Sequence, residues 1–416
     1  MFKRYSLFLA ADILGKAPAF LLLPFLTKNL SQEEYGLLAN YNSVVAFSYL
    51  AVDMSASGNL GAGYFKRTDQ ENNLTITSSV SVFFFNLILV ALFLISPWGQ
   101  GLVTSLGLDP RIIGLVCLQS FLTGFVLLMS TNERFKDKVY HVLIIQLVVF
   151  AVQIVLTYAL YNFFNSSIEL RIIAIIAAQL LGSLVGVFFL FKGNFKIKCP
   201  TWNLIKEVYG FGIPLIPHVL SGWLKSGADR FLITAYLGAA ILGIYSVGYQ
   251  LATAMMILAQ AIQKTVSPEI YKGLATYSKE TFSNTIRITF KGMVTLFVTG
   301  FAGYLLYYFS FDLIFSEEYK ESFFLIMPLF FYFFIKGIYI QASSYLYFLK
   351  KNWIISATNI VVSGLYILVL YLVLKSGVNA DRGLIWLVSI LIIAEFILFI
   401  TVVMSILYYK KKGLFY

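Results

Sequence analysis

Long apolar stretches follow one another along the whole chain, separated by short polar segments. Each stretch is roughly 20 residues long, which is the length of helix that crosses a ~30 Å hydrocarbon layer. The apolar residues are continuous rather than alternating, which argues against a transmembrane β-barrel. We therefore predict an all-α integral membrane protein with twelve spans. The spans are 7–26, 36–57, 76–96, 112–130, 140–161, 171–191, 208–236, 239–262, 288–309, 323–349, 353–374 and 384–408.

The composition agrees with this pattern. Of the 416 residues, 59% are hydrophobic and 12% are charged, whereas soluble domains are about 25% charged. This excludes a soluble enzyme, and the 17% aromatic content excludes a disordered chain. Most Phe and Tyr residues are expected at lipid-facing or interfacial positions. The only cysteines, Cys117 and Cys199, cannot form a disulfide framework or a CxxC metal site, so we expect no metal and no resident cofactor.

The net charge of +11 does not indicate nucleic-acid binding, because the basic residues cluster between the apolar stretches. Twelve spans place most Lys and Arg residues on one side of the membrane, as the positive-inside rule requires. Both termini are therefore predicted to be cytoplasmic. A cleavable signal peptide is not expected, because Lys16 interrupts the first apolar stretch.

A short internal repeat relates the two halves of the chain. Six spans per half would make the halves parallel, as in transporters with a pseudo-twofold axis along the membrane normal. We predict an N-terminal lobe, 1–200, and a C-terminal lobe, 201–416, around a central cavity. The repeat pairs Thr27 with Thr234, Leu30 with Leu237, and Gly36 with Gly243.

Several ionisable residues fall inside the predicted spans. Each would cost about 2.5 to 3.5 kcal/mol if it faced lipid at mid-bilayer, so these residues must pair, reach the interface or line a wet cavity. A wet cavity is where a polar substrate would bind. The residues are Asp12, Lys16, Asp53, Lys225, Asp229, Arg230, Lys336 and Glu395.

Four of these residues have simple structural explanations. Asp12 and Lys16 are one helical turn apart and could form an ion pair within their helix. Asp53 is near the cytoplasmic end of its span, where it could reach interfacial water. Arg230 could extend to the outer interface or pair with its neighbour Asp229.

Lys225, Lys336 and Glu395 lie near the middle of their spans, too deep to reach the interface easily. A role in a cavity is therefore favoured over a purely structural one for these three. The two amines suit an anion, and the carboxylate suits a cation or a proton.

The seventh span carries further polar positions. His218, Gly222, Lys225 and Asp229 would share one face of a continuous α-helix, which suggests an aqueous interior. His218 could be a proton carrier, although a lone helical histidine is more often hydrogen-bonded in a protein core. The other histidine, His141, lies in a basic cytoplasmic stretch and is expected to be solvated.

Prolines interrupt the first and seventh spans. They are Pro18, Pro24, Pro214 and Pro217. A proline removes a backbone hydrogen bond and kinks a helix. These prolines could mark gates of a two-lobed transporter, or static kinks that packing holds in place.

Two segments carry a resemblance to a known family. They are LPFLTKNLSQEEYGLLANYNSV, which begins at Leu23, and GIPLIPHVLSGWLKSGADRFLITAYLGAAILGIYSVGYQLA, which begins at Gly212. Together with twelve spans, they resemble the polysaccharide flippases of the multidrug, oligosaccharidyl-lipid and polysaccharide exporter superfamily, in particular the Wzx-type O-antigen translocases.

This resemblance implies a function without covalent chemistry. It implies that an undecaprenyl-diphosphate-linked oligosaccharide is moved from the cytoplasmic to the periplasmic leaflet of the bacterial inner membrane by alternating access. It further implies proton or sodium coupling, and a polysaccharide polymerase and a chain-length regulator as partners. The candidate substrate-binding cations are Lys16, Lys225, Arg230 and Lys336, and the candidate ion-coupling residues are Asp53, Asp229, Glu395 and His218.

Other classes remain open. A multidrug cation antiporter of the same superfamily would be expected to have a cavity dominated by carboxylates, whereas the deep charges here are mixed. A membrane polysaccharide polymerase or glycosyltransferase would need a large loop or a catalytic domain, and no predicted loop is long enough. A scaffold role would leave the buried charges unexplained.

Overall fold

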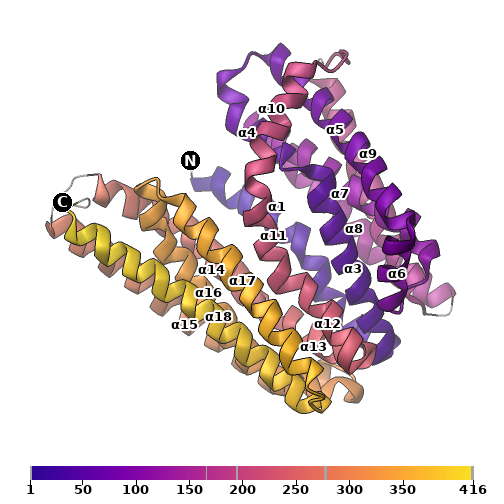
Figure 1. The fold of residues 1–416 in the computed structure, drawn as a ribbon. Coiled ribbons are helices and arrows are strands. Elements are labelled where there is room, and N and C mark those ends of the chain that lie inside the picture. Colours follow the sequence, from indigo (N-terminus) through magenta and orange to yellow (C-terminus); the bar gives the residue numbers. More distant parts are fainter. Residues whose placement is uncertain (1, 165, 194, 276–278, 414–416) are drawn as a thin grey trace. The chain divides into compact units, whose positions relative to one another are not determined.

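A computed structural model describes residues 2–164, 166–193, 195–275 and 279–413. Over these residues the chain is helical and has no strands, which confirms the predicted all-α class. The helices form two compact units, Met1–Trp223 and Leu224–Tyr416. Figure 1 shows the elements of each unit, from indigo at the N-terminus to yellow at the C-terminus.

Over its described residues, the first unit contains eleven α-helices. The most extensive packing joins α8 with α9, α1 with α8, and α7 with α9. The elements are α1 Phe2–Leu21, α2 Leu23–Asn29, α3 Gln32–Asp53, α4 Ala56–Gly63, η1 Tyr64–Lys66, α5 Asp69–Ile95, α6 Pro97–Ser105, η2 Pro110–Ile112, α7 Ile113–Phe135, α8 Val139–Phe163, α9 Ile168–Lys192, α10 Trp202–Gly212, η3 Ile213–Leu215 and α11 Ile216–Trp223.

The second unit begins with one π-helical segment, η4. Its long helices α14, α16 and α18 run side by side, and α17 packs against α18 (Figure 1). The elements are η4 Leu224–Ala228, α12 Asp229–Leu237, α13 Ala239–Ala252, α14 Ala254–Leu274, α15 Lys279–Ile314, η5 Glu317–Tyr319, α16 Lys320–Phe348, α17 Asn352–Lys375 and α18 Ala380–Lys411.

The boundary between the units lies inside the seventh predicted span, beyond the predicted lobe boundary at residue 200. The reason is α10, which packs against α4 and α5 of the first unit. Its Tyr209 hydroxyl donates a hydrogen bond to Asn86 Oδ1 at 2.9 Å, and its Glu207 forms an ion pair with Arg67. These contacts hold the first part of span seven to the N-terminal helices.

Within the described residues, ten helices are long and apolar enough to cross a membrane. They correspond to ten of the twelve predicted spans. The other two spans are helical but interrupted. The second span is broken between α3 and α4, where Met54 and Ser55 adopt left-handed backbone angles with φ of 44° and 56°. The seventh is divided among α10, η3, α11, η4 and α12.

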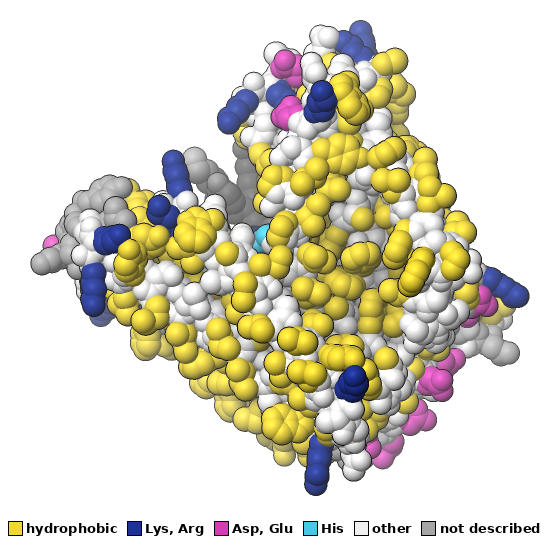
Figure 2. Space-filling view, in the orientation of Figure 1, with side chains coloured by type: hydrophobic (Ala, Val, Ile, Leu, Met, Phe, Trp, Pro, Cys, Tyr) yellow, Lys and Arg dark blue, Asp and Glu magenta, His cyan; other side chains and the backbone are white. Residues whose placement is uncertain are grey.

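The distribution of side chains on α5 fits a helix in lipid. Its buried positions include Ser78, Ser79 and Asn86, whereas Phe84 and Ile88 are more than half exposed. A soluble helix would show the opposite arrangement. Figure 2 shows hydrophobic side chains over most of the face in view, with Lys and Arg mainly at its margins. The chain is therefore a multi-pass membrane protein.

Local sequence signals explain where several elements begin. Ser31 and Thr68 are the N-caps of α3 and α5, and each forms a capping box with the glutamate three residues later, Glu34 and Glu71. The repeated motif falls at equivalent places in the two halves. Thr27 lies near the end of α2, and Thr234 lies near the end of α12.

The prolines lie at or near the helix interruptions. Pro18 lies in the last turn of α1, Pro24 is in the first turn of α2, and Pro214 lies in η3. Pro217 is the second residue of α11. Spans one and seven are thus both interrupted near prolines. Proline favours such an interruption because it lacks the backbone N–H that a regular helix needs.

Candidate functional site

The centre of the second unit contains a buried ion pair between two predicted site residues. Lys225 Nζ lies 3.0 Å from Glu395 Oε2, and the two side chains are 3% and 0% exposed. Lys225 comes from η4, and Glu395 lies near the middle of α18. A charged group at this depth needs such a partner, because burial without one is costly.

Asn359 of α17 positions the lysine from a second direction. Its Oδ1 lies 3.5 Å from Lys225 Nζ. Its Nδ2 donates hydrogen bonds to the Tyr339 hydroxyl at 2.5 Å and to the Ile355 carbonyl at 2.9 Å. The amide orientation is therefore fixed by α16 and by its own helix.

Asp229, one turn further along the chain, is fully buried and accepts three hydrogen bonds. Its Oδ2 accepts from the hydroxyls of Tyr245 at 3.1 Å and Tyr366 at 3.4 Å. Its Oδ1 accepts from the backbone N–H of Arg230 at 2.9 Å. Three donors stabilise the ionised carboxylate.

Arg230 and Lys336 lie against aromatic rings. The Arg230 guanidinium is 5.6 Å from the centre of the Tyr249 ring. Lys336 Nζ donates to the Tyr332 hydroxyl at 3.2 Å and lies 5.8 Å from the centre of the Phe333 ring. Rings at these distances attract a cation. The Tyr249 ring packs against the Phe333 ring with 5.1 Å between centres, which joins the two arrangements.

These groups form one cluster, which we call the C-terminal polar network. It contains three cations and two carboxylates and therefore has a formal charge of +1 when all are ionised. An interior site with excess positive charge is suited to hold an anion. The network consists of Lys225, Asp229, Arg230, Tyr245, Tyr249, Tyr332, Lys336, Tyr339, Asn359, Tyr366 and Glu395.

The tyrosines and Asn359 were missed by the sequence analysis, which assigned tyrosines mainly to lipid and interfaces. A signal was present, because Tyr332, Lys336 and Tyr339 have i, i+4 and i+7 spacing on α16. Tyr245 and Tyr249 are likewise one turn apart on α13. Sequence spacing does not reveal whether such a face points to lipid or to the protein interior.

The predicted polar face along span seven does not lie on one continuous α-helix. A continuous α-helix would place His218 and Gly222 in line with Lys225 and Asp229, but η4 interrupts the helix with a π-helical turn. His218 and Gly222 are exposed on α11, whereas Lys225 and Asp229 are buried in the second unit. A π-helical turn shifts the angular position of the residues that follow, and such turns are frequent at functional sites.

The first unit holds the remaining predicted charges. Asp12 of α1 pairs with Arg134 of α7, with Oδ1 and Nη2 2.5 Å apart. Lys16 is exposed on α1. Asp53 is buried and accepts a hydrogen bond from the Ser57 hydroxyl at 3.1 Å. It lines a mostly apolar cavity of about 600 Å³ between the α3 to α4 break and the helices α10 and α11.

Glu133 and His141 form a cluster that the sequence analysis missed. His141 Nδ1 lies 2.6 Å from Glu133 Oε2, and Lys136 Nζ lies 3.5 Å from Glu133 Oε1. The His141 ring stacks on Phe189 with 3.9 Å between centres. The expectation that His141 is simply solvated is wrong, because α9 supplies a ring that covers it.

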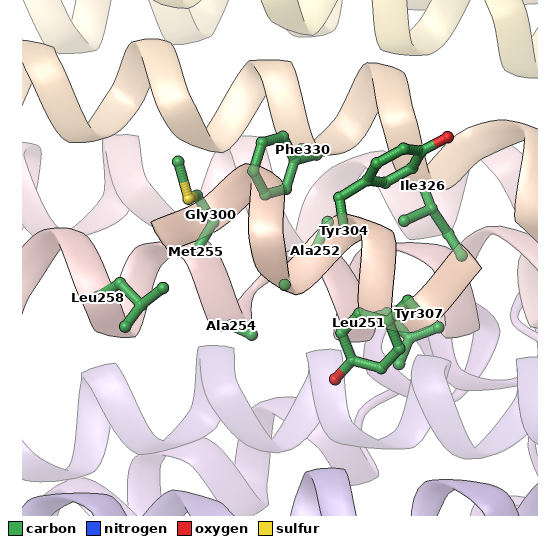
Figure 3. A pocket seen from close by; sticks show the side chains of 11 residues that line it. Leu251, Ala252, Ala254, Met255, Leu258, Gly300, Tyr304, Tyr307, Ile326 and Phe330 are labelled. Atoms are coloured by element: carbon green, nitrogen blue, oxygen red, sulfur yellow. The ribbon is translucent and has the colours of Figure 1, made fainter. Parts of the chain in front are cut away.

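A second, smaller cavity of about 40 Å³ lies among α13, α14, α15 and α16. Figure 3 shows its lining, in which Met255 lies next to Gly300 and Phe330. A Cβ atom at Gly300 would be 2.4 Å from Met255 Sδ, so glycine is needed for this close packing. The lining carries no charged side chain, and we assign this cavity to packing. No group of His, Cys, Asp and Glu side chains able to hold a metal ion occurs within the described residues.

Comparison with known proteins gives the family. The model of the family described as "Polysaccharide biosynthesis protein" matches residues 25–323, which is more than half of the chain. The chain belongs to this polysaccharide biosynthesis family. The match includes η4, α12 and α13 of the C-terminal polar network, and it confirms the resemblance drawn from the sequence.

Two relatives of this family member come from Haemophilus influenzae. Protein 1 of the Lsg locus is 26% identical over 278 residues, which are 66% of this chain and 67% of the relative. An uncharacterized membrane protein is 21% identical over 279 residues, 66% of each chain. The similarity thus spans about two thirds of the lengths of these relatives.

Solved structures show the same fold. An inward-facing multidrug resistance MATE family transporter of the MOP superfamily has a TM-score of 0.71 at 14% identity, with 95% of this chain and 96% of that chain covered. The lipid II flippase MurJ in an inward closed conformation has a TM-score of 0.70 at 13% identity, with 98% and 87% covered. The polysaccharide family member therefore shares the fold of this superfamily.

Proposed function

We propose that this protein is a flippase that moves an undecaprenyl-diphosphate-linked oligosaccharide from the cytoplasmic to the periplasmic leaflet of a bacterial inner membrane. Its product would feed the assembly of O-antigen or another surface polysaccharide. The observation that carries the proposal is the C-terminal polar network, in which Lys225, Arg230 and Lys336 outnumber two carboxylates among helices of membrane length. Membership of the polysaccharide family supports a glycan-related substrate.

The chemistry of this substrate matches the network. A diphosphate diester carries two negative charges, and charge-assisted hydrogen bonds from Lys or Arg are the strongest way to hold them. Lys16 of the first unit is a further cation for the same role. A membrane potential that is negative inside favours outward movement of an anion by about 2.3 kcal/mol per charge at 100 mV, if the charge crosses uncompensated.

Transport would proceed by alternating access of the two lobes, with the interruptions at Pro18, Pro24, Pro214 and Pro217 as bending points. Coupling to a proton or sodium ion would use residues among Asp53, Asp229, Glu395 and His218. Both termini would be cytoplasmic, and a polysaccharide polymerase and a chain-length regulator would act on the translocated units. No covalent chemistry is required.

One observation favours a second candidate function, export of organic cations. The cavity beside Asp53 is large, mostly apolar and has one buried carboxylate, a combination that suits an apolar monocation. We rank this function lower, because the C-terminal polar network contains more charged residues and has a positive formal charge, which would repel a cation.

Deletion of the gene tests both functions. Surface polysaccharide and extracted lipid-linked oligosaccharides would be examined, and the leaflet of any accumulated intermediate would be probed by modification from the periplasm. Loss of surface glycan with the intermediate on the cytoplasmic leaflet, restored by complementation, is the expected result. Single units exposed in the periplasm would instead indicate a polymerisation defect. Unchanged glycan with increased sensitivity to cationic drugs would indicate the cation exporter.

A further inference from the structure

We propose that the Lys225–Glu395 ion pair is an exchange switch that couples substrate binding to proton uptake. The substrate diphosphate takes the place of Glu395 beside Lys225, and the released Glu395 carboxylate takes up one proton. This inference rests on the proposed function, because it names how the same site accepts its anion. It assigns Glu395 to substrate-linked protonation and Lys225 to direct contact with the diphosphate.

The geometry of Glu395 makes its charge depend on Lys225. The side chain is fully buried, and its Oε2 contacts Lys225 Nζ at 3.0 Å. Its other oxygen, Oε1, has no hydrogen-bond partner within the part of the chain that the structure describes. If an anion takes the place of Glu395 beside the lysine ammonium, the displaced carboxylate loses its counter-ion. Protonation then removes the uncompensated charge.

Among the residues that the structure describes, no cation other than Lys225 lies within ion-pair distance of Glu395. The helices packed against α18 are α16 and α17. Lys336 acts on Glu395 through its charge, but its ammonium is held by the Tyr332 hydroxyl at 3.2 Å. The titratable groups that face Glu395 are Lys225 of η4, Tyr249 of α13, and Tyr332, Lys336 and Tyr339 of α16, with the uncharged Asn359 on α17.

The second carboxylate of the network is held by several hydrogen-bond donors rather than by one counter-ion. Asp229 accepts hydrogen bonds from Tyr245, Tyr366 and the backbone of Arg230. These three donors stabilise its ionised form, whereas Glu395 depends on a single cation. Proton uptake is therefore assigned to Glu395.

Charge balance supports one proton per substrate. The ionised network has a formal charge of +1, because Lys225, Arg230 and Lys336 face Asp229 and Glu395. Protonation of Glu395 raises this to +2, which balances the two negative charges of a diphosphate diester. A buried site of low dielectric strongly favours such neutrality.

Asn359 fits the switch as a positioning residue. Its Oδ1 lies 3.5 Å from Lys225 Nζ, and its amide group is fixed by Tyr339 and Ile355. When Glu395 is displaced, this amide oxygen still holds the ammonium near its resting position. The exchange then needs little movement of the backbone.

The test measures binding of geranyl-diphospho-N-acetylglucosamine to the full-length protein in nanodiscs by calorimetry. Both phosphates of this probe are diesters and stay ionised between pH 5.5 and 8.5, so any proton exchanged comes from the protein. Titrations in two buffers of different ionisation enthalpy count the protons. For the wild type we expect uptake of about one proton and a Kd that rises up to ~10-fold per pH unit.

Glu395→Gln should bind the probe with no proton uptake and with a Kd that does not change with pH. Glu317→Gln is the matched control, because Glu317 is also paired with a lysine, Lys320, at 2.7 Å but lies exposed outside the network. It should behave as wild type. The wild-type proton count tests the inference even if Glu395→Gln does not fold.

The outcomes separate the switch from the proposed function. Wild-type binding without proton uptake, or equal uptake in Glu395→Gln, would overturn the switch and leave the diphosphate site standing. No binding by a folded wild type at any pH would overturn the proposed function and the switch with it.

Discussion

The Asp229 carboxylate on α12 accepts a hydrogen bond from the Tyr245 hydroxyl on α13 at 3.1 Å, in the interior of the second unit. The two residues are 16 positions apart in sequence, on helices joined by a turn at Gly238. Gly238 has a φ of 93°, which residues other than glycine rarely adopt, so the turn that brings these residues together depends on glycine. The turn thereby gives the buried Asp229 carboxylate a hydroxyl donor from the neighbouring helix.

This relationship predicts the effect of removing one hydroxyl. Tyr245→Phe should lower the free energy of unfolding by about 1.5 to 3 kcal/mol, because a hydrogen bond to a charged group is lost. Tyr366→Phe should cost less, because its distance to Asp229 is 3.4 Å. Thermal unfolding of the purified variants in detergent checks the order. Equal stability of Tyr245→Phe and wild type would contradict it.

Removing Lys225 should disrupt the network more severely. Lys225→Ala leaves Glu395 buried without its counter-ion, which costs about 3 to 5 kcal/mol. The double variant Lys225→Ala with Glu395→Gln should recover much of this stability, because no unpaired charge remains. It should not recover translocation, because the cation is still absent. Unfolding midpoints and surface glycan in complemented cells measure the two effects, and a double variant no more stable than the single one would refute the pairing.

The deep amines are expected to be essential for transport. Lys336→Ala and Lys225→Ala should each abolish translocation while the protein still inserts at normal levels, because each removes a cation from the substrate site. Lys375→Ala is the matched control, since Lys375 is exposed at the end of α17 and lies over the Tyr371 ring at 5.5 Å. It should transport normally. Near-normal translocation by both deep variants would rule out this assignment.

Gly212 should tolerate no side chain. A Cβ atom there would lie 2.0 Å from the Met54 carbonyl oxygen, where α10 approaches the break between α3 and α4. Backbone atoms cannot move aside easily, so Gly212→Ala should reduce the amount of folded protein. Gly210→Ala is the control, because a Cβ at that position meets no atom within 4 Å. It should be neutral, or more stable by up to ~1 kcal/mol. Equal yields of folded protein for Gly212→Ala and Gly210→Ala would show that α10 does not pack this closely against Met54.

The sequence by itself determined the class of the protein and the positions of most helices. Continuous apolar runs such as 140–161 can only be satisfied as helices in lipid, because every backbone polar group must be paired within the segment. Capping boxes at Ser31 and Thr68 marked two helix starts. The deep positions of Lys225, Lys336 and Glu395 also followed from span length alone.

Only the tertiary structure decided which charges pair and which face is buried. Lys225 and Glu395 are 170 positions apart, and no local rule joins them. The π-helical turn of η4 shifts the positions after Trp223, so the regular helical period failed at the place where the site begins. From the sequence alone, the faces of α13 and α16 that carry tyrosines could equally be assigned to lipid or to the protein interior. Helical periodicity defines a face, but contacts between distant helices determine what that face meets.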